Sequence, residues 1–337
     1  MAAPLALSMG EPAGIAPEIT LKAWIARREE RLAPFFFIGD PAVLTDAAAS
    51  LGLTLPLVEI ARPAEAPALF DRALPVLPVA LPERAQAGHL DPRNSPAVLR
   101  AIDVAVEFCR AGEASGLVTN PIHKKALQDA GFRHPGHTEY LAELCGGMHP
   151  LMLFDSALLR VAPVTIHVPL REAISMLNRD LLLVSARLAA ASLRQDFGVK
   201  SPRIAVAGLN PHAGEQGSLG REDLDVIAPA VEAMRAEGID AFGPLPPDAM
   251  FHAAARQRYD LALCMYHDQA LIPLKTLDFD GAVNVTAGLP IVRTSPDHGT
   301  ALDIAGRGSA SPRSLIAAIR CAAGIAHQRA GAGKANG

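Results

Sequence analysis

The chain has 337 residues, half of them hydrophobic, which is enough for two domains or one large one. Charged residues make up 20% and aromatic residues 4%, a composition typical of a folded protein and not of a disordered one. The net charge of −4 argues against a general attraction to nucleic acid or to anionic membranes. Any anionic ligand must therefore be held by a local group of basic residues.

The chain shows no sign of disulfides, a signal peptide or a membrane anchor. Its four cysteines are far apart and form no CxxC pair, so we expect small, reduced, buried side chains. Glu11 soon interrupts the short apolar run at the N-terminus, which lacks a basic region and predicts a strand. No stretch of 18 apolar residues is free of Pro or charge. We expect a cytoplasmic protein that binds neither membrane nor nucleic acid.

Strand-like apolar runs alternate with segments of helical periodicity along the chain. Strands are predicted over residues 5–9, 35–39, 116–119, 161–167, 203–208, 261–266 and 282–285. Helices are predicted over residues 17–25, 41–51, 96–110, 121–130, 181–197, 224–237 and 311–326. Residues 56–95, rich in Pro and Ala, are left without assigned elements. The alternation predicts an α/β fold with helices layered on a largely parallel sheet.

Histidines follow three of the predicted buried strands. His167 follows residues 161–166, His212 follows the strand that ends near residue 209, and His267 follows residues 261–266. Parallel sheets place their sites at the carboxyl ends of strands, and three neutral imidazoles with an open fourth position are typical of a catalytic metal site. A single histidine there is more often structural. The three are too far apart for a local motif, so a shared site requires the fold or a second subunit.

Other residues are candidates for binding an anion. Lys275, Asn284 and Arg293 lie in or after apolar segments, and together they would suit a phosphate monoester, although each alone is compatible with a surface role. Thr138 is predicted to cap a helix, with His137 before it at the helix N-terminus; a capped helix with an exposed histidine is the alternative.

The segment 297–312, DHGTALDIAGRGSASP, is rich in glycine and other small residues before a helix. Backbone approaches a ligand closely in such loops, which bind phosphates or nucleotides but also form simple turns. Neither GxGxxG after a strand nor GxxxxGK[ST] is present, so a dinucleotide would have to bind in another way.

Several blocks that span nearly the whole chain carry a family resemblance. The chain resembles the 4-hydroxythreonine-4-phosphate dehydrogenases of pyridoxal phosphate biosynthesis in MGEPAGIAPEI, GLVTNPIHKKAL, GFRHPGHTEYLA, VTIHVPL, GLNPHAGEQGSLGRE, MYHDQALIPLK and VNVTAGLPIVRTSPDHGTALDIAG. GEPAGIAPE replaces the family's usual GDPAGIGPE, PPDAMF stands where PADTxF is common, and VTAGLP has Ala where Leu is usual. These departures change loop details and remove none of the named ligands.

The resemblance implies the isocitrate and isopropylmalate dehydrogenase fold, with two α/β/α domains and a cleft between them. We expect one domain over residues 1–125 with 295–330, carrying the cofactor loop. The other, residues 126–294, would carry metal and substrate residues and a dimer interface. Residues 331–337 are predicted to form a frayed tail.

The resemblance also implies the site residues and the assembly. His167, His212 and His267 match the family's divalent-metal ligands, zinc being the best suited and magnesium or cobalt the alternatives. Family members are homodimers whose site is completed across the interface, with the third histidine from the partner chain. The residues that match substrate contacts are His137, Thr138, Lys275, Asn284 and Arg293. The loop that resembles the group's adenosine-binding loop contributes His298, Gly299, Thr300, Ala301 and Asp303 to binding NAD or NADP.

The activity implied is oxidation of 4-phosphooxy-L-threonine by NAD to 2-amino-3-oxo-4-phosphooxybutanoate, which decarboxylates to 3-amino-2-oxopropyl phosphate. Asp248, Asp268 and a metal-bound water are the candidates for the general base. One alternative is a related metal-dependent dehydrogenase that decarboxylates a dihydrodiol carboxylate. A second alternative, from another class, is a metal-dependent phosphohydrolase that uses no nucleotide.

Overall fold

The computed structural model describes residues 3–134, 136–147 and 149–335, which form two compact units. Unit 1 comprises residues 1–148 and 289–327, and unit 2 comprises residues 149–288 and 328–337. The division places residues 126–148 and 289–294 in unit 1, whereas the sequence predicted them in the second domain. As a result, His137, Thr138 and Arg293 belong to one unit, while the three candidate metal ligands belong to the other.

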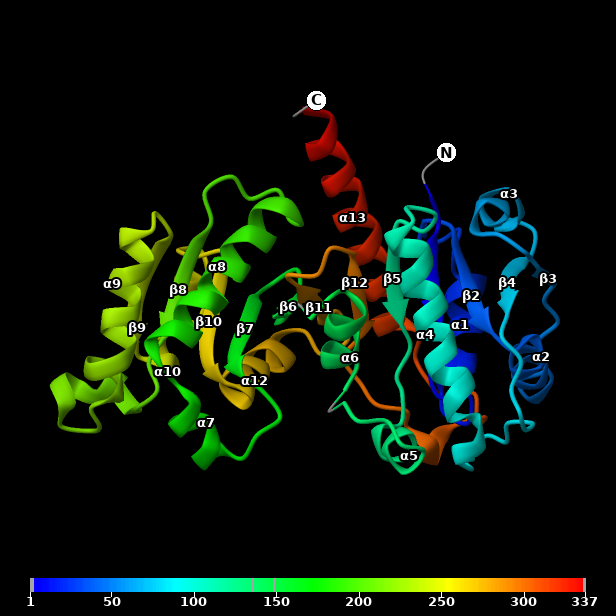
Figure 1. Cartoon of the computed structure of the whole chain (residues 1–337), viewed down its shortest axis with the longest axis horizontal. Coiled ribbons are helices and arrows are strands. Elements are labelled where there is room, and N and C mark those ends of the chain that lie inside the picture. The colour runs from blue at the N-terminus through cyan, green and yellow to red at the C-terminus, as the bar shows by residue number, and fades with distance from the viewer. Residues whose placement is uncertain (1–2, 135, 148, 336–337) are drawn as a thin grey trace. The chain divides into compact units, whose positions relative to one another are not determined.

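Unit 1 is built on a parallel sheet that is covered by helices (Figure 1). Its strands lie in the order β3 (Leu57–Glu59), β4 (Leu74–Pro78), β2 (Phe35–Gly39), β1 (Leu5–Ser8), β5 (Gly116–Thr119) and β12 (Arg293–Pro296). Its helices are α1 (Ala16–Ile25), α2 (Pro41–Ser50), α3 (Ala66–Leu69), α4 (Ser95–Arg110), α5 (Lys124–Asp129), α6 (His137–Leu144) and the first part of α13 (Arg313–Ala335). Short 3-10 turns are η1 (Pro63–Glu65), η2 (Pro92–Asn94) and η5 (Leu302–Ile304).

Unit 2 has a mixed sheet. Its strands lie in the order β11 (Val283–Ala287), β6 (Leu151–Asp155), β7 (Arg160–Thr165), β10 (Leu261–Tyr266), β8 (Arg203–Ala207) and β9 (Asp240–Leu245). The pairs from β7 to β9 are parallel, whereas β6 runs antiparallel to both of its neighbours. The helical segments are α7 (Leu170–Met176), α8 (Arg179–Gln195), η3 (Pro211–Gly217), the π-helical η4 (Asp223–Ile227), α9 (Ala228–Ala236), α10 (Pro247–Met250), α11 (Ala253–Arg256) and α12 (His267–Leu277).

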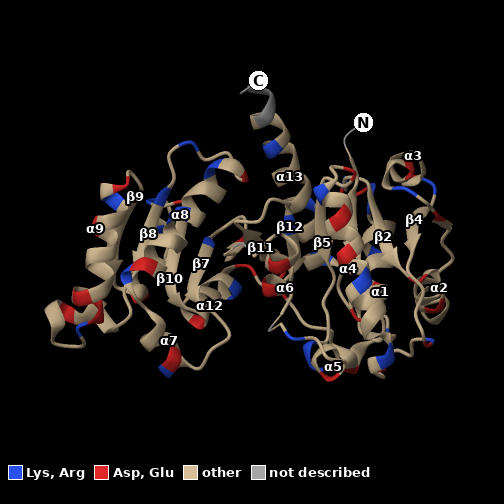
Figure 2. Ribbon diagram, in the orientation of Figure 1, with Lys and Arg blue, Asp and Glu red and all other residues tan. Residues whose placement is uncertain are grey.

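The predicted α/β fold is confirmed, because continuous apolar runs do form strands buried on both faces. In β1 and β2 every residue is buried, including the consecutive Phe35, Phe36 and Phe37. Figure 2 shows that charged residues largely avoid these strands: the strands are mostly tan, while Lys, Arg, Asp and Glu lie mainly on helices and loops. Within the described ranges, no helix has both the length and the hydrophobicity needed to cross a bilayer.

Three details differ from the sequence expectations. Residues 56–95, left unassigned, contain β3, β4 and three short helical turns. The helix α13 continues through residues 331–335, which were predicted to fray. All four cysteines are free thiols, but only Cys264 is buried, while the other three are partly exposed.

A buried glutamine side chain bridges, by hydrogen bonds, the ends of two strands that precede candidate site residues. Gln269, in the first turn of α12, is 7% exposed. Its Oε1 accepts a hydrogen bond from Met265 N at 2.6 Å, and its Nε2 donates to Gly208 O at 2.7 Å. Met265 is the second-to-last residue of β10 and Gly208 follows β8, so this side chain fixes the spacing of two strand ends.

We expect Gln269→Leu to lower the free energy of unfolding by about 3 kcal/mol, because it leaves a buried N–H and a buried carbonyl unpaired. Urea denaturation monitored by circular dichroism measures the change. Gln257→Leu, at an exposed position in the same unit, is the matched control and should alter stability little. Equal stabilities of the two variants would contradict the bridging role.

Candidate active site

Two of the predicted metal ligands lie together at the carboxyl edge of the sheet in unit 2. His167 follows β7 and His267 follows β10, two strands that pair in parallel, so their ends meet at one edge. The two imidazole rings have centroids 5.7 Å apart and line a cavity of about 250 Å³. Asp268, Tyr266 and Leu170 also line this cavity.

The imidazole pair fits a single divalent ion. Two histidines on one zinc ion, with Zn–N bonds of about 2.1 Å and a tetrahedral angle, would have ring centroids roughly 5 Å apart, close to the separation observed. His267 Nδ1 lies 2.7 Å from Asp268 Oδ1, so the carboxylate holds the ring and directs Nε2 away as the free ligand atom. The side chains of His267 and Asp268 are 37% and 70% exposed, which leaves the pair accessible.

The structure does not bring His212 into this group. The residues it describes contain no cluster of three or more His, Cys, Asp and Glu side chains arranged to hold a metal. His212 lies exposed in η3, after β8, and α10 with the exposed Asp248 packs against the same segment. One chain therefore supplies a pair of imidazoles, while His212 lies in η3, a segment that contacts α10, the helix of Asp248.

Two of the three histidines have a strained backbone. His167 has φ of 47° and His212 has φ of 53°, and the left-handed stretch of η3 continues through Gln216. Side chains other than glycine pay a steric penalty in this region, and such residues concentrate at functional sites. The buried carboxylate of Asp223 fixes the backbone just before η3, because it accepts hydrogen bonds from Leu209 N at 2.7 Å and from Asn210 N at 3.0 Å.

We expect His212→Gly to raise the free energy of unfolding of the metal-free protein by about 1 kcal/mol, because glycine relieves the left-handed strain. The same change should lower zinc affinity at least about tenfold, measured by competition with a chromophoric chelator. Ala213→Gly, at a neighbouring residue with φ of 50°, should stabilise the protein equally and keep zinc affinity. A loss of zinc binding in both variants would assign the effect to the loop and not to the imidazole.

Unit 1 contains a buried cationic site. Arg293, the first residue of β12, is 3% exposed and donates from Nη2 to Thr119 Oγ1 at 2.7 Å. Burial lowers the pKa of its guanidinium to about 10, although nearby Glu139 opposes the change. His137 Nε2 is buried and has no hydrogen-bond partner among the described residues. A buried guanidinium beside an unsatisfied imidazole nitrogen is an arrangement that suits an anionic ligand.

The predicted cap of α6 is wrong in detail. Gly136, and not Thr138, is the N-cap, and no side chain caps the helix, which begins at His137. Thr138 is buried inside the first turn. The N–H groups at this helix start are therefore not occupied by a capping side chain, which favours an incoming anion. The Tyr140 hydroxyl of α6 donates to Asp103 Oδ1 at 2.5 Å and joins the helix to α4.

Sequence reasoning missed Lys124, which belongs to the same site. Its Nζ lies about 3.5 Å from where a Cβ on Gly136 would stand, which puts this ammonium close to the start of α6. Burial is the main cause of the strongly lowered pKa of His137, with the charges of Arg293 and Lys124 adding to it. The signal was present in NPIHKKAL, where a basic pair follows a buried strand, but nothing in the sequence relates it to His137.

Because the pKa of His137 is lowered in the folded protein, folding disfavours its protonation. Below about pH 6.5 the unfolded chain binds a proton there that the folded chain resists, so stability falls by up to about 1.4 kcal/mol per pH unit. We expect His137→Gln to lose less stability than the parent protein between neutral and mildly acidic pH, as measured by urea denaturation. His327→Gln, at an exposed position, should follow the parent; identical slopes for both variants would contradict the burial of a neutral His137.

The remaining predicted substrate residues lie in unit 2. Lys275 is on α12, partly exposed, with Nζ 5.5 Å from the centroid of the Phe279 ring. Asn284 is on β11, and its buried Oδ1 has no hydrogen-bond partner among the described residues. An unsatisfied buried amide oxygen is a second sign of a polar ligand.

The predicted cofactor loop is anchored to the start of α1. Thr300 O accepts from Ile15 N at 3.0 Å, and a Cβ on Gly14 would come within 2.7 Å of Thr300 O, so only glycine permits this approach. Glu18 Oε1 accepts from Ala310 N at 2.9 Å and from Lys22 Nζ at 2.7 Å. Of the remaining predicted cofactor residues, Ala301 adopts the left-handed conformation, and Asp303 and Gly299 are exposed, beside the partly exposed His298.

Two solved dehydrogenase structures are similar to this chain. The 4-hydroxythreonine-4-phosphate dehydrogenase from Klebsiella pneumoniae matches with a TM-score of 0.87 and 39% identity, over 96% of this chain and 100% of that one. A terephthalate 1,2-cis-dihydrodiol dehydrogenase from Burkholderia xenovorans LB400 matches with a TM-score of 0.64 and 28% identity, over 96% and 98%.

The family follows from sequence. The model for the pyridoxal phosphate biosynthetic protein PdxA matches residues 30–322, and the chain belongs to this family. A relative from Bradyrhizobium diazoefficiens, named 4-hydroxythreonine-4-phosphate dehydrogenase, is 53% identical over 336 residues, covering 96% of this chain and 97% of the relative. The expected family membership is thus confirmed.

Proposed function

We propose that this protein oxidises 4-phosphooxy-L-threonine with NAD to 2-amino-3-oxo-4-phosphooxybutanoate, which decarboxylates to 3-amino-2-oxopropyl phosphate. The observation that carries the proposal is the His167–His267 pair at the carboxyl edge of a parallel sheet, in a chain whose relatives carry the name of this activity. Bound NAD would accept the hydride. A bound divalent ion, zinc by the donor set, would favour loss of the hydroxyl proton and polarise the resulting ketone.

The chain's own residues would bind and orient the substrate. Arg293, His137 and Lys124 supply donors and positive charge for the phosphate group, and the uncapped start of α6 adds backbone N–H groups. Thr138 lies in the same turn. In unit 2, Lys275 and Asn284 would bind the remaining polar groups of the substrate and hold the carbinol carbon in position for hydride loss.

The two candidate carboxylates differ in their surroundings. Asp268 is hydrogen-bonded to His267 Nδ1, which suits a residue that orients a ligand histidine. Asp248 is exposed on α10, beside the segment of His212. We therefore assign the hydroxyl proton to Asp248 and the positioning of His267 to Asp268.

We further propose a homodimer in which His212 and Asp248 of one protomer complete the site formed by the imidazole pair of its partner. This assembly accounts for a pair, and not a triad, within one chain. Exposed large apolar side chains support it. Of the nine among the described residues, eight belong to unit 2: Leu158, Leu170, Ile174, Met176, Leu219, Leu224, Ile272 and Phe279. Ile272 and Phe279 are 64% and 68% exposed, which is costly unless a partner covers them.

The alternative substrate is a dihydrodiol carboxylate, which the similarity to the Burkholderia xenovorans enzyme supports. The buried cationic site of unit 1 favours the phosphorylated substrate, because a carboxylate carries half the charge of a phosphate dianion. A phosphohydrolase would leave the cofactor loop without a purpose.

The proposal predicts that NADH absorbance rises when 4-phosphooxy-L-threonine and NAD are added, and that a chelator lowers the rate at least about a hundredfold because the alkoxide loses its stabilisation. Added zinc should restore the rate. If the enzyme turned over only the terephthalate dihydrodiol, the proposed substrate would be wrong and the dihydrodiol carboxylate would take its place. Full turnover after complete metal removal would overturn the metal role.

The shared site predicts complementation between inactive variants. Mixed subunits of His167→Ala and His212→Ala form heterodimers with one intact site, so the mixture should recover about one quarter of the parent kcat. A mixture of His212→Ala and Asp248→Ala should recover no activity. In the proposed dimer each protomer donates both His212 and Asp248 to its partner's site, so every mixed site lacks one of the two. Recovery in both mixtures, or in neither, would contradict the assembly.

A further inference from the structure

One carboxylate in unit 1 lies among cationic groups without pairing with them. Glu139 is in the first turn of α6 and is partly buried. Its Oε2 and the Nζ of Lys124 each lie 3.5 Å from the position that a Cβ on Gly136 would take. Its negative charge also acts to raise the pKa of the buried Arg293 guanidinium, against the larger effect of burial. Glu139 therefore borders the group of donors proposed above to bind the phosphate.

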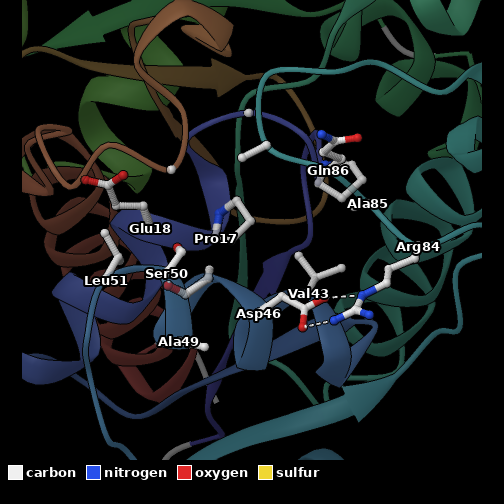
Figure 3. A pocket seen from close by; sticks show the side chains of 15 residues that line it. Pro17, Glu18, Val43, Asp46, Ala49, Ser50, Leu51, Arg84, Ala85 and Gln86 are labelled. Carbon is white, nitrogen blue, oxygen red and sulfur yellow. Dashed lines mark hydrogen bonds and ion pairs between the residues drawn. The ribbon is translucent and has the colours of Figure 1, made fainter.

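Two other acidic side chains of unit 1 form close ion pairs. Asp46, on the wall of a cavity beside α2, accepts hydrogen bonds from Arg84 Nε at 2.9 Å and from Arg84 Nη2 at 2.7 Å (Figure 3). Glu18 accepts from Lys22 Nζ at 2.7 Å. In contrast, the side chain of Glu139 makes no hydrogen bond and no ion pair within the part of the chain that the structure describes. Its carboxylate is held near positive charge and is left available to a ligand.

A carboxylate in this position is unfavourable for a ligand that carries only negative charge. Like charges repel strongly where burial limits solvent screening, so a phosphate bound by Arg293 and His137 loses affinity while Glu139 is ionised nearby. The penalty becomes a gain when the ligand also carries a positive group that reaches the carboxylate. 4-Phosphooxy-L-threonine has one such group, the 2-ammonium, in addition to its phosphate and its carboxylate.

We propose that Glu139 binds the 2-ammonium group of the substrate and thereby selects phosphorylated amino acids over phosphates that lack an amine. The inference deepens the proposed function and rests on it. In the complex the ammonium donates to the Glu139 carboxylate, while His137 and Arg293 donate to the phosphate. Attraction of the correct ligand and repulsion of the wrong one both contribute to the selection. The same carboxylate disfavours a dihydrodiol carboxylate, whose only charge is negative.

The test compares 4-phosphooxy-L-threonine with the same molecule without its amino group, 3-hydroxy-4-phosphooxybutanoate. Calorimetry measures the binding of each to the protein with zinc added, and the ratio of the two affinities is the readout. We expect Glu139→Gln to reduce the preference for the amine at least about tenfold, because it weakens binding of one ligand and strengthens binding of the other. Glu139→Asp keeps the charge and should retain more of the preference. Circular dichroism checks that both variants are folded.

Glu143→Gln is the matched control, because this glutamate lies on the same helix with a side chain that is 71% exposed. Its preference for the amine should equal that of the parent protein. The inference is overturned if Glu139→Gln leaves the ratio unchanged, if it tightens binding of both ligands by the same factor, or if Glu143→Gln loses the preference equally. Selective binding of the amine without NADH formation would reject the proposed oxidation and leave the role of Glu139 standing.

Discussion

Parallel pairing of β7, β10 and β8 is the constraint on which the candidate site of unit 2 depends. Because the three strands run in one direction, the residues that follow them emerge at one edge of the sheet. The buried apolar runs fix which residues are strand and therefore where each strand must end. Gln269 then sets the spacing of two of these ends through its paired amide contacts. In the sequence His267-Asp268-Gln269, Gln269 thus bridges two strand ends, Asp268 is hydrogen-bonded to His267, and His267 is the proposed metal ligand.

The candidate site of unit 1 depends more on electrostatic interactions than the histidine pair of unit 2 does. Folding brings the buried Arg293 guanidinium close to the buried Nε2 of His137 and to Lys124, although all three groups are cationic or can become so. Burying these groups together costs electrostatic free energy. The apolar burial of the surrounding sheet compensates for that cost, and a bound anion would reduce it. The same folding energy holds His167 and His212 in left-handed conformations that an isolated chain would avoid.

Much of this arrangement was predictable from periodicity and strand order. Leu261–Tyr266 formed the expected strand, and both His167 and His267 lie at the predicted edge. His212 follows its strand as expected, but it does not join the pair. The left-handed backbone of η3, which sets the direction of its side chain, could not be predicted from the sequence. Lys124 and the cavity beside α2 were not foreseen, since they depend on contacts between segments far apart in sequence. The N-cap of α6 was misassigned because Thr favours caps in general, whereas the local backbone puts Gly136 there.

The separation of His212 from the imidazole pair has a thermodynamic consequence. Where a metal ion takes ligands from two protomers, its binding free energy also holds the protomers together, and the coupling is reciprocal. Metal affinity then depends on protein concentration, and the dimer dissociation constant depends on free metal. In the proposed dimer, a shortage of the metal would shift the protein toward separate subunits, and its quaternary structure would report the metal supply.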